Sequence, residues 1–289
     1  MSAGPETPPG SGSDRDGGAA AGAVVPATAG PRRRLGRLER LAIEGVMTRE
    51  VINWLSFWKS STFSSTVEPT IYLLAFGFGF GSIVSEIDGY DYVDYVGTGT
   101  VATSVLFGSA FSAMFGSFVK REFQRTYDAI LAAPVDVEEL VTAEALWMAI
   151  RASVYGCFPL LVAMIFGLDP AWGMLLVPLL CFPCAFGFAS FGLLISAIVR
   201  SIDSFSYYQS LILTPLFLVA GTFFPLDGLP RGIQIASELN PLHHLVELVR
   251  GAAFGFDGWH DVARFAALIV FALVMWRLAI RQSTKRLIT

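Results

Sequence analysis

The sequence predicts an all-α, polytopic membrane protein with six transmembrane helices, an N-terminal amphipathic interface helix and short outer re-entrant helices between spans five and six. Three observations predict this class. Only 15% of the residues are charged, whereas a soluble domain carries about 25%. The mean hydropathy is +0.58. Long apolar runs recur from residue 64 onward, and a helix needs about 20 such residues to cross a bilayer.

Composition divides the chain into three segments. Residues 1–31 are mostly Gly, Ala, Pro and Ser, and we predict a disordered leader because such a segment buries too little apolar surface to offset its ordering entropy. The leader has no basic start followed by an apolar run, so it is not a signal peptide. Residues 32–60 predict an amphipathic cytoplasmic interface helix, since apolar and basic residues alternate at helical spacing and tryptophans close the segment. Residues 61–289 form the predicted six-helix transmembrane domain.

Within that domain the apolar runs place six spans in order along the chain. They lie near 64–84, 95–119, 145–167, 173–198, 207–224 and 260–280. The first span is interrupted by serines and by Glu68, and the fifth is short and contains Pro215. The stretch between spans five and six has apolar patches too short to cross, and we predict one or two short helices at the membrane face there.

Basic residues set the predicted orientation, because cytoplasmic loops are enriched in Lys and Arg. With six spans both termini share a side, and that side carries sixteen basic residues against three on the other: Arg231, Arg250 and Arg264. We therefore expect a multi-pass membrane protein with both termini in the cytoplasm.

The sequence lacks the motifs of several catalytic and ligand-binding classes. No G-x-x-x-x-G-K-[ST] loop, G-x-S-x-G elbow or H-E-x-x-H helix occurs. Cys157, Cys181 and Cys184 lie in apolar stretches, and His243 and His244 are adjacent, so they diverge on a helix rather than chelate one ion. We predict no catalytic residue, no cofactor and no metal ligand in this chain.

Three charged residues within or near the predicted spans are candidate intramembrane polar groups: Glu68, Glu144 and Arg151. Glu144 precedes Arg151 by seven residues and lies on a similar helical face, so the two are able to pair directly or through water. The other interpretation is snorkelling or local pairing near an interface. Because charge in the spans is so sparse, the energy for any transport is expected to come from another subunit.

The segment between spans two and three predicts a helix, a break and a second helix. Pro134 ends the first helix, and Asp136 caps the second, which has Glu138 and Glu139 in its first turn. Such a unit at the membrane surface is either a rigid docking element for a partner or an ordinary connecting loop.

Several runs of the sequence resemble ABC-2 type transporter permeases, most closely the branch of the nodulation-factor (lipo-chitooligosaccharide) exporters. These runs are Glu68–Gly81, Arg125–Val135 and Tyr207–Pro225, with Leu226–Pro230 and Leu239–Arg250 continuing the likeness. The resemblance covers residues 40–289 and leaves the leader outside it.

The resemblance implies a permease subunit of an exporter that moves an amphipathic, lipid-like or drug-like substrate out of the cytoplasm. It implies a homodimer of permeases in membrane lipid and separate ABC ATP-binding subunits that bind ATP and Mg, with no nucleic-acid partner. It also implies that the first cytoplasmic loop couples the permease to the ATPase. The coupling residues are then Arg125, Tyr127, Asp128, Pro134, Glu138 and Glu139.

Two other function classes remain as alternatives. A membrane-embedded lipid or glycan transferase would show clustered Asp, Glu or His at a membrane face, and the sequence shows no convincing cluster. An ion-coupled carrier is disfavoured by the scarcity of charge deep in the predicted spans.

Overall fold

The computed structural model describes residues 38–81, 83–84, 86–87, 89–226 and 228–288, without the side chains of residues 64–66, 68–69, 78 and 288. The chain divides into two units, Met1–Arg34 and Leu35–Thr289, and the described elements all belong to the second. The leader predicted over 1–31 therefore lies outside the described residues, as do residues 32–37 of the predicted interface helix.

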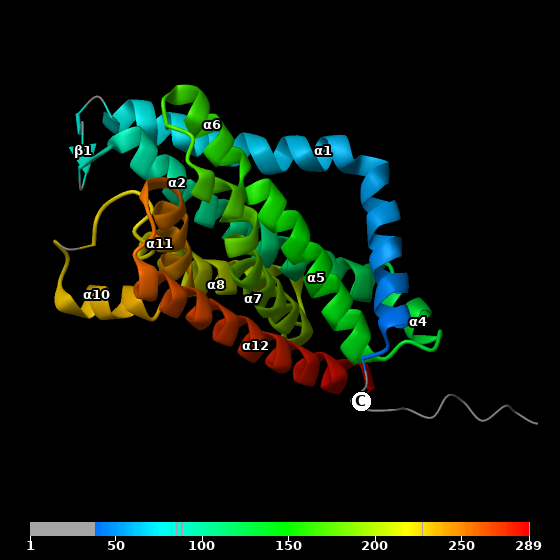
Figure 1. The fold of residues 1–289 in the computed structure, drawn as a ribbon. Coiled ribbons are helices and arrows are strands. Elements are labelled where there is room, and N and C mark those ends of the chain that lie inside the picture. Colours follow the sequence, from blue (N-terminus) through cyan, green and yellow to red (C-terminus); the bar gives the residue numbers. More distant parts are fainter. Residues whose placement is uncertain (1–37, 82, 85, 88, 227, 289) are drawn as a thin grey trace, which may run out of the picture. The chain divides into compact units, whose positions relative to one another are not determined.

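The described chain is almost entirely helical (Figure 1). A two-residue antiparallel hairpin pairs β1 (Glu86–Ile87) with β2 (Tyr90–Asp91). The α-helices are α1 (Arg40–Gly81), α2 (Tyr92–Leu106), α3 (Ser112–Phe118), α4 (Thr126–Leu131), α5 (Val137–Gly156), α6 (Phe158–Phe166), α7 (Val177–Ile198), α8 (Phe205–Tyr208), α9 (Thr214–Leu218), α10 (Arg231–Glu238), α11 (Pro241–Phe254) and α12 (Gly258–Ile288). Three π-helical turns, η1 (Phe107–Phe111), η2 (Val119–Phe123) and η5 (Gln209–Leu213), and two 3₁₀ turns, η3 (Trp172–Leu176) and η4 (Ile202–Ser204), complete the chain.

Four helical stretches are long and apolar enough to cross a membrane, and they confirm four of the predicted spans. They are Tyr92–Phe123, Val137–Phe166, Trp172–Ile198 and Gly258–Leu287. The second of them begins eight residues before the predicted 145, because Asp136 starts the helix well before the apolar run does. The chain is therefore a multi-pass helical membrane protein.

The other two predicted spans coincide with helices that do not meet those criteria. The first falls in α1, whose apolar part is Thr70–Gly81. The fifth corresponds to α8, η5 and α9, which together run from Phe205 to Leu218. At 1.5 Å per residue this stretch is about 21 Å long, less than the roughly 30 Å of bilayer hydrocarbon. The chain leaves the helix after Leu218 and turns at Gly221, where φ is +80°.

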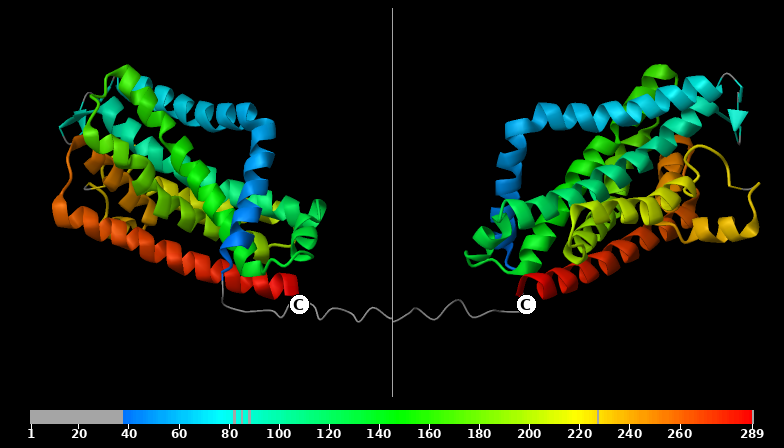
Figure 2. Two further views of the ribbon diagram at one scale, coloured as in Figure 1. Left: turned by 45° about the vertical axis from the view of Figure 1, so that its right-hand side comes forward. Right: turned by 180° about the vertical axis from the view of Figure 1, so that it is seen from behind.

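Helix α1 bends at Phe57, whose φ and ψ of −135° and 22° are not helical, and both views of Figure 2 show the bend. The beginning of α1 lies at the end of the bundle that carries α4, called here the α4 end, because the Glu39 N–H donates to Glu139 Oε1 at 2.6 Å. The last turn of α1 lies against Val93 at the other end, called here the hairpin end after β1 and β2.

The segment between α7 and α12 also passes from one end to the other. Near the end of α7, the Ser196 carbonyl accepts a hydrogen bond from Arg121 of η2, at the α4 end. By Gly221 the chain has reached the hairpin end, because the Gly221 carbonyl accepts from the Tyr95 hydroxyl at 3.3 Å. The short stretch Phe205–Leu218 therefore supplies most of this passage.

Helix α7 forms the centre of the bundle and packs against α12, α5 and α3. At Gly192 it approaches η1 closely, since a Cβ atom there would lie 2.5 Å from the carbonyl oxygen of Ala110. The side chain of Phe188 packs edge-on against Phe271 of α12. Cys181 and Cys184 are buried free thiols in the same helix.

Two short helices occupy the stretch between the fifth and sixth predicted spans, where one or two were expected. Helix α10 is mostly exposed, whereas α11 buries Leu242, Leu245 and Val249 against α2, α7 and α12. Asn240 caps α11 and also donates to the Leu216 carbonyl at 2.7 Å. Helix α11 is thus a packed part of the bundle at the hairpin end.

Candidate functional site

The helix, break and helix predicted at the α4 end are present. Helix α4 ends at Leu131, and Asp136 caps α5 through a capping box in which the Glu139 carboxylate accepts from the Asp136 N–H. Arg125, just before α4, is the one non-glycine residue with positive φ in the described chain, at +52°. A residue with a side chain is uncommon in this conformation, so the entry to α4 is a sharp, defined turn.

The six predicted coupling residues divide between the surface and the interior. Arg125, Asp128 and Pro134 are exposed, Glu138 is half-buried, and Tyr127 and Glu139 are buried. Arg125 and Asp128 form an exposed ion pair at 3.6 Å. The unit therefore presents charged groups outward while Tyr127 and Glu139 hold it to the bundle.

Tyr127 leads into a buried polar network that connects five elements of the fold. Its hydroxyl donates to the fully buried Glu144 of α5, which also accepts from Ser117 of α3 at 3.2 Å. The Lys120 ammonium group of η2 donates to Glu144 and to Glu50 of α1, both at 2.9 Å. We call Glu50, Ser117, Lys120, Tyr127 and Glu144 the buried network.

The charge of the buried network is balanced by Arg49, which lies beside it. Two carboxylates, Glu50 and Glu144, face two cations, Lys120 and Arg49, the latter 2.7 Å from Glu50. Burial and the neighbouring Glu144 carboxylate raise the pKa of the Tyr127 phenol well above its ordinary value, so Tyr127 stays a hydrogen-bond donor. Buried ions are tolerated when they are paired and hydrogen-bonded, and removal of any one partner leaves another uncompensated.

Glu144 and Arg151 do not pair directly. The Glu144 carboxylate accepts hydrogen bonds from Lys120, Ser117 and Tyr127. These residues lie outside α5, so the spacing of residues within α5 does not predict them as partners. Arg151 instead faces a cavity. Glu68, the third candidate, lies within α1, and its side chain is outside the described residues.

The cavity beside Arg151 has a volume of about 470 Å³. Its wall combines hydroxyl groups, aromatic rings and one cation, contributed by α1, α2, η1, α3, α5, η5 and α9. The lining residues are Tyr72, Thr100, Thr103, Ser104, Phe107, Gly108, Phe111, Ser112, Arg151, Ala152, Tyr155, Gln209, Thr214 and Phe217. Two of the π-helical turns, η1 and η5, supply parts of this wall, and π-helical turns recur at functional sites.

Arg151 has no hydrogen-bond acceptor and no carboxylate at ion-pair distance among the residues that the structure describes. An ionised arginine within a span costs about 2.5–3.5 kcal/mol on insertion scales. An arginine in this position is therefore a functional-site candidate rather than a structural ion pair.

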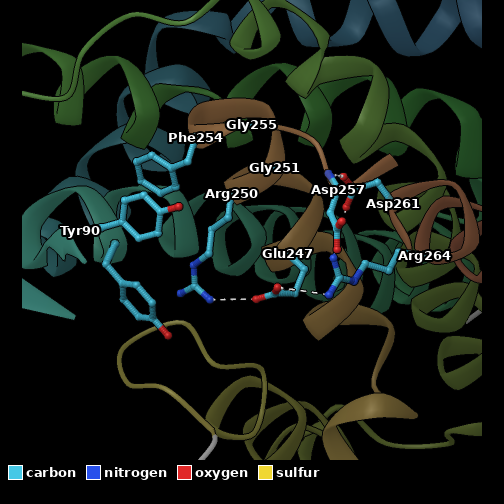
Figure 3. Close-up of a pocket in the computed structure, with 10 residues that line it drawn as sticks. Tyr90, Glu247, Arg250, Gly251, Phe254, Gly255, Asp257, Asp261 and Arg264 are labelled. Atoms are coloured by element: carbon cyan, nitrogen blue, oxygen red, sulfur yellow. Dashed lines mark hydrogen bonds and ion pairs between the residues drawn. The ribbon is translucent and has the colours of Figure 1, made fainter. Parts of the chain in front are cut away.

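A second pocket, of about 250 Å³, lies at the hairpin end (Figure 3). The Arg250 guanidinium stacks on the Tyr95 ring at 3.6 Å and donates to the Gly221 carbonyl at 2.7 Å. Glu247 bridges Arg250 and Arg264, at 3.1 Å and 3.4 Å. The ion pairs tie α11 to α12, and Arg250 ties α11 to α2 by stacking and to the turn at Gly221 by a hydrogen bond.

Sequence reasoning did not find the cavity, the Lys120 bridge or the hairpin-end ion pairs. Lys120 was counted only as one of the basic residues of the predicted cytoplasmic side. The hairpin-end pairs did carry a local signal, since Glu247 and Arg250, and likewise Asp261 and Arg264, are three residues apart on a helix.

Comparison with known proteins supplies the family context. A family model described as "ABC-2 type transporter" matches residues 42–254. Nodulation protein J of Sinorhizobium fredii is 30% identical over 250 residues, which are 82% of this chain and 95% of that protein. Nodulation protein J of Rhizobium meliloti is 30% identical over 248 residues, 81% of this chain and 94% of that protein. The inner membrane transport permease YadH of Escherichia coli is 26% identical over 245 residues, 82% of this chain and 94% of YadH.

Proposed function

We propose, because this chain belongs to the ABC-2 type transporter family, that it is the permease of an exporter driven by ATP hydrolysis in a separate subunit. Its relatives include named transport permeases, and the chain is a multi-pass membrane permease. The finer statements are the direction of transport, the source of energy and the nature of the cargo. The source of energy and the nature of the cargo are argued from the residues described above, and the direction follows from the resemblance to exporter permeases.

The buried network is the observation that carries this proposal. It joins the α4 segment, whose outer face is charged, to α5 by way of Tyr127 and Glu144. Two turns farther along α5, Arg151 lines the cavity. Since loss of a hydrogen bond to a buried carboxylate costs about 1–3 kcal/mol, a displacement of α4 is expected to move α5 with it. A force applied by a partner at α4 thereby reaches the cavity wall.

The course of the chain between the two ends of the bundle supports six crossings with both termini in the cytoplasm. Helix α1 passes from the α4 end to the hairpin end, and the segment from Phe205 to Gly221 does the same. Together with the four long apolar helices this gives six passages. The α4 end carries Lys120, Arg121 and Arg125, as the cytoplasmic side of a bacterial inner membrane would.

The cavity supports an amphipathic cargo, lipid-like or drug-like, because its wall combines phenylalanine rings with hydroxyl groups. We further propose that two copies of the chain assemble in membrane lipid and that Arg125, Asp128, Pro134 and Glu138 contact the ATP-binding subunit. ATP and Mg are then bound by that subunit.

Reconstitution tests the proposal. The purified chain, alone and together with the ATP-binding protein encoded nearest to its gene, is placed in liposomes loaded with fluorescent amphiphiles. We expect no ATP hydrolysis by the chain alone, a stable complex with the partner, and ATP-dependent efflux by the complex. Robust hydrolysis by the isolated chain, or turnover of a lipid-linked substrate without nucleotide, would contradict the proposal and favour an enzyme.

A further inference from the structure

The position of Arg151 constrains the chemistry of a molecule that binds in the cavity. Arg151 lies seven residues beyond Glu144 on α5, which places it about 10 Å farther from the α4 end at 1.5 Å per residue. Glu144 is fully buried and has three donors, whereas Arg151 has no acceptor within the described part of the chain. Its guanidinium group carries five N–H donors and keeps its charge in proteins.

The described residues of the cavity wall do not balance that charge. None of the fourteen described lining residues is acidic, and Arg151 is the one cation among them. The Ser104 hydroxyl donates to the Thr100 carbonyl and the Thr214 hydroxyl to the Gln209 carbonyl, whereas the buried Thr103 hydroxyl has no partner among the described residues. The described lining therefore carries a positive charge and an unused hydroxyl beside its aromatic surface.

We propose that this cavity binds the acidic headgroup of an amphiphile, a phosphate, sulfate or carboxylate attached to an apolar chain, with Arg151 as its ionic partner. A guanidinium group pairs with such groups through two parallel hydrogen bonds. The rings of Phe107 and Phe217, 5.9 Å apart, offer the apolar chain a surface next to the charge. The inference deepens the proposed function and rests on it in one respect, because it treats the bound amphiphile as the transported cargo. The binding itself is measured on the chain without an ATP-binding subunit.

Equilibrium binding to the purified full chain in phosphatidylcholine nanodiscs tests the inference. The probes are dodecyl phosphate, the neutral dodecyl glycerol ether and dodecyltrimethylammonium, which share one apolar chain and differ in charge. We expect dodecyl phosphate to bind at least about tenfold more tightly than the other two, as a charge-assisted hydrogen-bonded pair implies. Equal binding of the three probes would overturn the inference.

Variants locate the effect at Arg151. Arg151→Gln is expected to lose the preference for dodecyl phosphate and to bind the neutral ether as the wild type does, while Arg151→Lys retains part of the preference. Arg281→Gln, which removes an exposed charge of the same sign from α12, should match the wild type. Arg151→Gln should also raise the thermal stability of the ligand-free chain, because it removes an unpaired charge; a loss of stability would contradict the absence of a partner.

Two further arms separate the possible sources of the acidic group. Inorganic phosphate alone should compete weakly; full competition by it would show a simple anion site and overturn the role of the apolar chain. Phosphatidylglycerol in the nanodisc either competes, which identifies a bilayer lipid as a ligand of the same chemistry, or leaves binding unchanged, which supports a cargo distinct from the bilayer. Selective binding without ATP-dependent efflux in the reconstituted complex would contradict the proposed function and leave this inference standing.

Discussion

Replacement of Lys120 by methionine removes the cation at the centre of the buried network and keeps a side chain of similar length. In the wild type the Lys120 ammonium group lies 2.9 Å from both Glu50 and Glu144, and the lysine side chain is only 12% exposed. In the variant Glu144 keeps its two neutral donors, Ser117 and Tyr127, but no cation in contact, and Glu50 keeps Arg49.

The expected loss follows from leaving a buried carboxylate without its cation. Breaking a buried ion pair by removing one partner costs about 3–5 kcal/mol. The two neutral donors on Glu144 place Lys120→Met at the lower end, at about 3 kcal/mol, which is roughly a hundredfold in the unfolding equilibrium. We also expect ATP-dependent efflux to fall more than ATP hydrolysis, because Lys120 would no longer hold η2, the segment that leads into α4, to Glu144 of α5.

The assay is reversible unfolding in mixed micelles with increasing sodium dodecyl sulfate, followed by far-UV circular dichroism. Lys59→Met, which removes an exposed lysine of α1, is the matched control and should stay within about 0.5 kcal/mol of the wild type. The double variant Lys120→Met with Glu144→Gln should recover part of the loss, since the amide needs no cation. A Lys120→Met variant as stable as the control, or strictly additive losses in the double variant, would refute the reasoning.

Three further predictions concern the α4 segment. Tyr127→Phe removes the hydroxyl that donates to Glu144 and should lower the free energy of unfolding by about 1–3 kcal/mol. In the wild type the raised pKa keeps the Tyr127 phenol protonated in the folded state, while the phenol of the unfolded chain ionises. The stability of the wild type should therefore fall as the pH rises above about 10, more steeply than that of Tyr127→Phe. Charge reversal at Arg125 or Asp128 should leave stability within about 0.5 kcal/mol, since both side chains are exposed, yet abolish ATP-dependent efflux; normal efflux in both variants would remove the segment from the coupling route. Asp136→Ala breaks the capping box of α5 and should cost about 0.5–2 kcal/mol of stability, seen as faster amide exchange in its first turn, whereas unchanged exchange there would contradict the capping role.

Local sequence patterns predicted the elements whose formation depends on their own residues. The four long apolar helices follow from hydropathy alone, because a bilayer requires about 20 apolar residues in a row whatever surrounds them. The start of α5 follows from Asp136 and Glu139, since a capping box forms within four consecutive residues. The resemblance of several sequence runs predicted the family, and the comparisons bear it out.

The elements that local patterns did not specify depend on partners distant in sequence. The passage of Phe205–Leu218 between the two ends of the bundle is visible only once Ser196 and Gly221 are located against Arg121 and Tyr95. The hydropathy pattern predicts a short fifth span near 207–224, and contacts with distant segments show between which ends of the bundle the chain passes there.

The sequence by itself determined that this protein lies in a membrane, where four of its spans run and how its first loop folds, because hydropathy and capping act over one helix or one turn. Only the tertiary structure decided which partners the charged side chains contact. Glu144 and Arg151 share a helical face, yet Lys120 binds Glu144, and Arg151 is left facing a cavity. The physical reason is that a buried charge takes the partner that packing brings within about 3 Å, and packing joins segments that the sequence keeps far apart.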